Sequence, residues 1–154
     1  MKSKLLLAML TFTLAGTAAA QMKPDDAIKF RQSGYTFMSW NMGKLKGMLV
    51  DNPASFNKDQ AIAAANVIAA TANSGMGALY VPGSDKGKGW KETRVKPELF
   101  TDKEGVGKVA MAFNKEANEL AKVAATGDAA ALKVQFGKVG ETCKGCHDKF
   151  RKED

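Results

Sequence analysis

The chain has 154 residues, a formal net charge of +7 and a single histidine. A chain of this length can form one domain with its own core but hardly two. Its lysines and arginines are spread along the sequence, which favours a solvated surface or an acidic protein partner over a nucleic-acid partner.

Residues 1–20 have the pattern of a secretory signal peptide. Two lysines precede an apolar run over residues 5–14, and three alanines at positions 18–20 supply a small-residue cleavage pattern. This run is shorter than the about 20 residues that span a bilayer, although an uncleaved membrane anchor is the alternative. We therefore expect export to the periplasm, a mature domain over residues 21–154, no membrane attachment after cleavage and no nucleic-acid partner.

Two helices are predicted in the first half of the mature chain. Pro24 and the two acidic residues after it suit a helix N-terminus, and side chains recur at steps of three and four until Asn52-Pro53. This predicts a helix over residues 24–50, and an alanine-rich stripe predicts a second helix over residues 58–74. The recurring face of the first helix comprises Ile28, Arg31, Gln32, Tyr35, Met38 and Met42.

Residues 75–100 are predicted to form a loop, because glycine and proline are too dense there for regular structure. A loop of this length is uncommon unless it is functional.

The segment Thr101-Asp102-Lys103-Glu104 has the form of a capping box and begins a helix that we expect to end near residue 126, before Gly127. Asp128 is expected to cap the last helix. The inward stripe of that helix is Leu132, Phe136, Val139, Cys143, Cys146 and Phe150.

These four helices, with no strand pattern between them, predict an all-α protein with an antiparallel four-helix bundle. Cofactors in such bundles commonly lie between facing helices. We expect most of the methionine, phenylalanine and alanine side chains at helical spacing to form the core.

Cys143-Lys144-Gly145-Cys146-His147 is a C-x-x-C-H sequence, the attachment motif for c-type haem. Two thiols can add to the two vinyl groups of a haem, and positions i and i+3 share one face of a helix. A histidine at i+4 can then bind the iron. The motif predicts one covalently attached haem c per chain, with His147 as the metal ligand.

Two other interpretations of the cysteine pair are weaker. A thioredoxin-like pair is expected near the start of a helix that follows a strand, whereas this pair lies late in a helix. A structural zinc site usually takes four protein ligands, and the chain offers two cysteines and one histidine.

The second axial position of the iron cannot be another histidine, because His147 is the only one in the chain. Methionine, tyrosine, lysine, water or a vacant position remain. A methionine would make an electron carrier, whereas a vacant position would leave the iron open to small gases.

The sequence resembles the cytochromes c′, four-helix cytochromes whose haem motif lies near the C-terminus. The resemblance covers nearly all of the mature chain. It is carried by Lys-Pro-Asp-Asp-Ala at residues 23–27, Phe-Arg-Gln at 30–32, Lys-Pro-Glu-Leu-Phe at 96–100, the C-x-x-C-H motif, and Phe150-Arg151.

The resemblance implies a high-spin, five-coordinate haem with His147 as the proximal ligand, and a homodimer formed largely by the first two helices. It implies that Arg31, Gln32 and Arg94 contact the haem and that Tyr35 lies over the distal face of the iron. A guanidinium also suits a haem propionate.

Other roles are open for three of these residues. Arg31 can instead be a solvated surface charge, and Tyr35 a core tyrosine whose hydroxyl is satisfied elsewhere. Arg151, four residues after His147, is expected beside the proximal imidazole, or else is one of several exposed basic residues.

We therefore expect a periplasmic haem protein that binds nitric oxide or carbon monoxide and exchanges electrons with an unidentified redox partner. The alternative is a six-coordinate electron carrier with Met38 or Met42 on the iron. An enzyme is not expected, because no distal histidine is left for acid–base catalysis.

Overall fold

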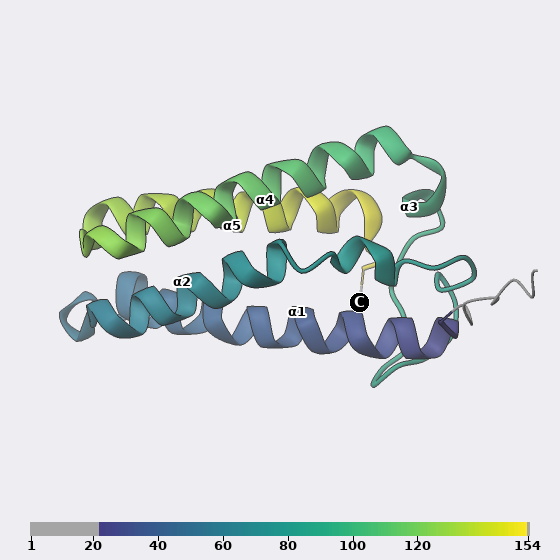
Figure 1. Ribbon diagram of the computed structural model, residues 1–154, viewed down its shortest axis with the longest axis horizontal. Helices are drawn as coiled ribbons and strands as arrows, with labels where there is room; N and C mark the ends of the chain where they lie inside the picture. Colours follow the sequence, from purple (N-terminus) through teal and green to yellow (C-terminus); the bar gives the residue numbers. More distant parts are fainter. Residues whose placement is uncertain (1–21, 154) are drawn as a thin grey trace, which may run out of the picture.

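The computed structural model describes residues 22–153, so the predicted signal peptide lies outside the described residues. Four long helices form the molecule: α1 (Pro24–Lys46), α2 (Lys58–Ala72), α4 (Lys103–Thr126) and α5 (Ala129–Phe150). They run antiparallel in a bundle, with the start of α1 and the end of α5 at the same end (Figure 1). The predicted all-α, antiparallel four-helix bundle is confirmed.

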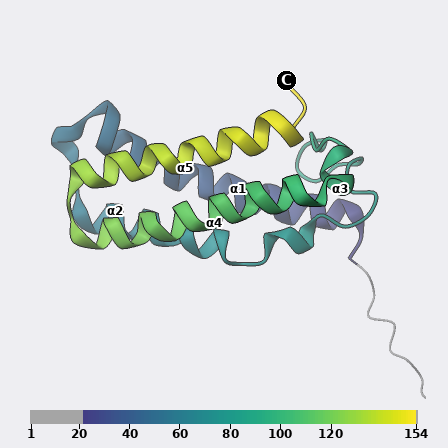
Figure 2. The same cartoon turned by 90° about the horizontal axis from the view of Figure 1, so that it is seen from above.

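Neighbouring helices in the chain are also neighbours in space. α1 packs on α2, α2 on α4 and α4 on α5, and Figure 2 shows the last pair side by side. The first part of the chain packs on α5 mainly through the π-helical turn that follows α1, η1 (Gly47–Asp51). This turn lies at the end of the bundle opposite the C-x-x-C-H motif. Within the described residues no helix is long and apolar enough to cross a membrane.

The first predicted helix changes its hydrogen bonding before it ends. In η1 the Asn52 N–H donates to the Gly47 carbonyl at 2.9 Å, five residues back, which widens the turn. This turn buries Met48 and Leu49, and a 3-10 turn, η2 (Pro53–Ser55), follows. The prediction of a helix over residues 24–50 is therefore right in extent and differs in the geometry of its last turn.

The predicted loop over residues 75–100 is not irregular throughout. It contains a 3-10 helix, η3 (Met76–Leu79), and a short helix, α3 (Glu98–Thr101). Because α3 takes in Thr101, the residue that caps α4 is Asp102, whose carboxylate accepts a hydrogen bond from the Gly105 N–H at 2.8 Å. The predicted capping box was thus placed one residue too early.

The close-packed core lies away from the motif end of the bundle. On α4 the next buried residue after Gly105 is Ala117, and on α5 no residue between Val139 and Phe150 is buried. The motif end of these helices is therefore incompletely covered by the chain's own side chains. The core comprises Met38, Leu45, Met48, Leu49, Ala61, Ala64, Ala65, Ile68, Ala117, Leu120, Ala124, Leu132 and Val139.

Candidate haem site

The two motif cysteines lie half-buried on the last turns of α5. Both are free thiols, and Cys143 packs against the edge of the core. Burial raises the pKa of both Cys143 and Cys146, so each is a protonated thiol at neutral pH. A redox-active pair needs a depressed pKa, and the thioredoxin-like interpretation is therefore not supported.

His147 lies beside two arginines. Its Nδ1 is 3.3 Å from Nη1 of Arg151, and because a guanidinium only donates, Nδ1 accepts in this contact and Nε2 carries the ring proton. Iron binding at Nε2 requires the other tautomer, with the proton on Nδ1. Partial burial first, and then the charge of Arg94, lower the pKa of His147. The imidazole is accordingly neutral near pH 7, the form that binds a metal.

The backbone brings Arg94 to this position. The Lys96 N–H donates to the Phe150 carbonyl at 2.9 Å, and the Lys152 N–H donates to the Arg94 carbonyl at 2.8 Å. These bonds pair the segment before α3 with the C-terminal turn after α5. Arg151 therefore lies beside the imidazole, as expected, whereas the contact of Arg94 with haem remains a prediction.

Arg31 of α1 is buried, with 3% of its surface exposed. Its Nη1 donates to the Leu79 carbonyl at 3.1 Å and to Ser84 Oγ at 2.8 Å, and its Nη2 donates to the Ser84 carbonyl at 2.5 Å and to Thr93 Oγ1 at 2.7 Å. Burial lowers the pKa of Arg31, yet an arginine remains charged at neutral pH. The interpretation of Arg31 as a solvated charge is therefore wrong.

Gln32, the neighbouring predicted haem contact, also holds the loop. Its Nε2 donates to the Lys91 carbonyl at 2.9 Å, and its Oε1 accepts from the Trp90 N–H at 2.8 Å. Gly89 approaches α1 so closely that a Cβ there would lie 2.7 Å from the backbone nitrogen of Lys29. The side chains of Arg31 and Gln32 therefore fasten residues 79–93 to α1, and their contact with haem remains a prediction.

Tyr35 is 38% exposed and is not a core residue. Its hydroxyl accepts a hydrogen bond from the Tyr80 hydroxyl at 3.1 Å. Burial is the largest cause that raises the pKa of both tyrosines, and the neighbouring Cys146 makes a smaller contribution in the same direction. The two phenols are therefore close enough to the motif cysteine to interact with it electrostatically.

Three residues of this site were missed in the sequence: Tyr80, Ser84 and Thr93. They lie in the glycine-rich and proline-rich segment, where no periodicity indicates which side chains face α1. The only signal was the length of the predicted loop, which suggested a functional segment.

The residues present fit a haem. The two thiols and the imidazole lie on the last turns of one helix, at a bundle end that the chain's own core leaves incompletely covered. Across residues 22–153, no three His, Cys, Asp or Glu side chains are arranged to hold a metal ion, so the zinc interpretation finds no ligand set there.

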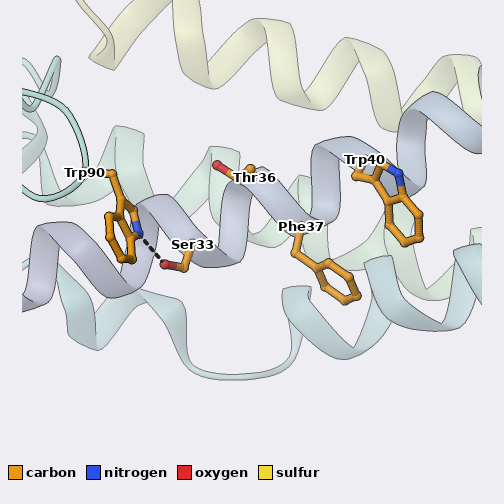
Figure 3. Close-up of a pocket in the computed structure, with 5 residues that line it drawn as sticks. All are labelled: Ser33, Thr36, Phe37, Trp40 and Trp90. Carbon is orange, nitrogen blue, oxygen red and sulfur yellow. Dashed lines mark hydrogen bonds between the residues drawn. The ribbon is translucent and has the colours of Figure 1, made fainter.

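A second feature lies on the face of α1 turned away from Tyr35. Ser33, Thr36, Phe37, Trp40 and Trp90 line a shallow groove, and the Trp90 indole N–H donates to Ser33 Oγ at 2.8 Å (Figure 3). The Phe37 and Trp40 rings are stacked with centroids 5.7 Å apart. No motif or periodicity in the sequence predicts this groove.

A four-helix bundle whose last helix ends in C-x-x-C-H, with both thiols free and a neutral imidazole beside them, defines a helical c-type haem protein. The cytochrome c′ family model matches residues 26–151. The chain belongs to the cytochrome c′ family, whose members are haem proteins.

Known members of the family support this assignment. The cytochrome c′ of Rhodocyclus tenuis is 64% identical over 132 residues, covering 86% of this chain and 98% of the relative. A solved cytochrome c′ described as having an unusual ligand-controlled dimer dissociation is 56% identical, with a TM-score of 0.82 and coverage of 87% and 100%. A variant of the Alcaligenes xylosoxidans protein, solved as a nitric oxide complex, is 31% identical, with a TM-score of 0.75 and coverage of 86% and 98%.

Proposed function

We propose that the protein is a periplasmic carrier of one haem c with five-coordinate, high-spin iron, which binds nitric oxide or carbon monoxide and exchanges electrons with a redox partner. The observation that carries the proposal is His147: the only histidine in the chain lies directly after the cysteine pair on α5. The nitric oxide complex of a relative supports the gas ligand.

Each residue has a role in this proposal. Cys143 and Cys146 would hold the haem through thioether bonds, and Nε2 of His147 would bind its iron. Burial and then the positive charge of Arg94 lower the pKa of the imidazole and favour its neutral form, and Arg151 contacts its Nδ1. When bound, the haem supplies an iron that takes one further small ligand.

The surroundings of Met38 and Met42, the two methionines considered as alternative ligands, support an open position on the iron. Met38 is buried in the bundle core, and Met42 packs against that core. Either side chain would have to leave its apolar surroundings to reach a haem, at a cost of about 1.5–3 kcal/mol for one buried apolar side chain. No such cost applies to a five-coordinate iron.

The absorption spectrum of the purified protein tests this proposal. We expect high-spin bands in the ferric and dithionite-reduced forms, and a shift of the reduced bands on addition of carbon monoxide. Sharp low-spin bands that do not respond to carbon monoxide would favour the methionine-ligated carrier. Absence of haem absorption would refute both functions.

Tyr35 is the residue that we propose to lie over the distal face of the iron. Truncation by Tyr35→Ala is expected to speed carbon monoxide association with the reduced protein, because it removes the ring that covers the site. The measurement is the rate after flash photolysis. An unchanged rate would remove Tyr35 from this role while leaving the haem assignment intact.

A homodimer through α1 and α2 is also part of the proposal. Trp40, which lines the groove of Figure 3, is 57% exposed, and exposed aromatic clusters are typical of protein interfaces. The relative with ligand-controlled dimer dissociation supports it. Sedimentation velocity at micromolar concentration is expected to show a dimer, and a monomer under those conditions would contradict the expectation.

The proposed location rests on residues 1–20, whose composition is that of a signal peptide. Mass spectrometry of the periplasmic protein is expected to find a mature chain that begins at Gln21. No enzyme activity is proposed, because His147 is the only histidine and would be occupied by iron.

A further inference from the structure

The hydroxyl of Tyr80 contacts the residue that we propose to lie over the iron. Tyr80 donates its hydrogen bond to Tyr35 at 3.1 Å, across 45 residues of sequence. A tyrosine hydroxyl has one hydrogen to donate, and that of Tyr80 is used here. The position of the Tyr35 ring is therefore coupled to the segment that follows η3.

This segment is fastened to α1 close to Tyr80. The guanidinium carbon of Arg31 lies 4.8 Å from the centre of the Tyr80 ring, and Arg31 Nη1 donates to the carbonyl of the preceding Leu79 at 3.1 Å. On the other side, Met76 packs so closely on α1 that a Cβ at Gly34 would lie 2.9 Å from its Cε. Tyr80 is thus held by its neighbours, whereas Tyr35 projects from α1 with much of its surface exposed.

The charged and titratable groups around the pair come from two helices, α1 and α5. Arg31 on α1 faces both phenols, and the two motif cysteines on α5 lie within electrostatic range of Tyr35. Burial raises the pKa of both tyrosines, so both hydroxyls are protonated at neutral pH and their hydrogen bond persists.

We propose that Tyr80 is a positioning residue for the distal side of the haem: its hydroxyl holds the Tyr35 ring in place, and the loop thereby sets how fast a small ligand reaches the iron. This inference rests on the proposed function, and specifically on the position of Tyr35 over the distal face. Without the Tyr80 hydroxyl, the Tyr35 ring is free to turn aside and the path to the iron is open for a larger fraction of the time.

The test is a double-mutant cycle on the haem-loaded protein. Tyr80→Phe and Tyr35→Phe each remove one hydroxyl and leave the ring, and carbon monoxide association with the reduced protein is measured for each single variant and for the double variant. Loss of one neutral hydrogen bond is expected to speed association about twofold to tenfold in each single variant. The double variant is expected to be no faster than the single variants, because both changes break the same bond.

A second measurement is independent of ligand binding. The chain has two tyrosines, so each single variant contains one, and ultraviolet resonance Raman scattering can report whether its hydroxyl is hydrogen-bonded. In Tyr80→Phe the Tyr35 signal is expected to change to that of a phenol that no longer accepts a bond. The double variant, which has no tyrosine, supplies the blank.

Ser33→Ala is the matched control. It removes the bond that Trp90 donates at 2.8 Å, and so also loosens the loop, but on the face of α1 away from Tyr35. We expect its carbon monoxide association rate to equal that of the wild type. A comparable rise in Ser33→Ala would show that any loosening of the loop opens the site and would overturn the specific role of Tyr80.

Other results also decide between the possibilities. A carbon monoxide rate in Tyr80→Phe equal to the wild-type rate, or additive effects in the double variant, would overturn the inference while the proposed function stands. A purely structural role would lower the melting temperature and leave the effects of the two hydroxyls additive. A wild-type protein that does not bind carbon monoxide would overturn the proposed function itself, and this inference with it.

Discussion

Replacement of His147 by alanine is expected to abolish the native iron spectrum while the haem stays attached. Both cysteines remain in this variant, so the thioether bonds can still form, but no histidine is left in the chain to bind the iron. The absorption spectrum measures the iron environment, and the mass of the intact chain shows whether the haem is attached. Added imidazole is expected to restore much of the native spectrum.

Lys144→Ala is the control for this variant. Lys144 lies within the same motif, is exposed, and forms a surface ion pair with Asp148. A surface substitution of this kind changes the free energy of unfolding by about 0.5 kcal/mol or less, and the spectrum is expected to remain that of the wild type. A wild-type spectrum in His147→Ala would refute the ligand assignment.

Arg31→Ala is expected to lower the free energy of unfolding by about 3 kcal/mol. The change leaves Ser84 and Thr93 without the cation that binds them, and it leaves a cavity between α1 and the loop. Individual hydrogen bonds to a charged group contribute about 1.5–3 kcal/mol each, but the buried guanidinium is itself costly to desolvate, so the four bonds do not add. For a domain of this size the loss corresponds to a fall in melting temperature of about 10 °C.

Urea unfolding of Arg31→Ala, with Lys29→Ala as the control, measures this effect. Lys29 lies two residues earlier on α1, and its Nζ lies 4.4 Å from the centre of the exposed Trp90 ring, so its removal is expected to cost about 0.5–1 kcal/mol. Arg31→Lys is expected to be intermediate, because one ammonium group cannot reproduce the planar array of donors. A loss below about 1 kcal/mol in Arg31→Ala would show that the loop is held mainly by other contacts.

The helices and the cysteine motif were predictable because they depend on short sequence separations. Steps of three and four residues identified the inward stripe of α5, and its members Leu132, Val139 and Phe150 are buried in the bundle. The Asp128 cap was predicted from the residue type, and its carboxylate accepts hydrogen bonds from Ala130 N and Ala131 N. A residue's nearest neighbours along the chain are enough to predict these features.

Two local predictions failed in detail where neighbouring segments compete. Thr101 fits a capping position, yet α3 takes it into a turn of its own and Asp102 becomes the cap. Met42 of the inward stripe of α1 packs against the core and is only partly buried, whereas Asn41 and Leu45 are the fully buried residues there. Tertiary packing decides such one-residue shifts, because adjacent registers differ little in local free energy.

The sequence alone therefore determined the helical bundle, the C-x-x-C-H motif and the single available histidine ligand, since periodicity and motif spacing are local properties. Only the tertiary structure decided where residues 79–93 lie and which groups they bring to α1. The partners of Arg31 are 48 to 62 residues away in sequence, and two of them are backbone carbonyls, which every residue carries. The contact between Tyr35 and Tyr80 could not be predicted for the same reason, because an irregular segment has no periodicity that indicates its facing side. The position of this segment is set by the buried Arg31, whose hydrogen-bond donors it satisfies.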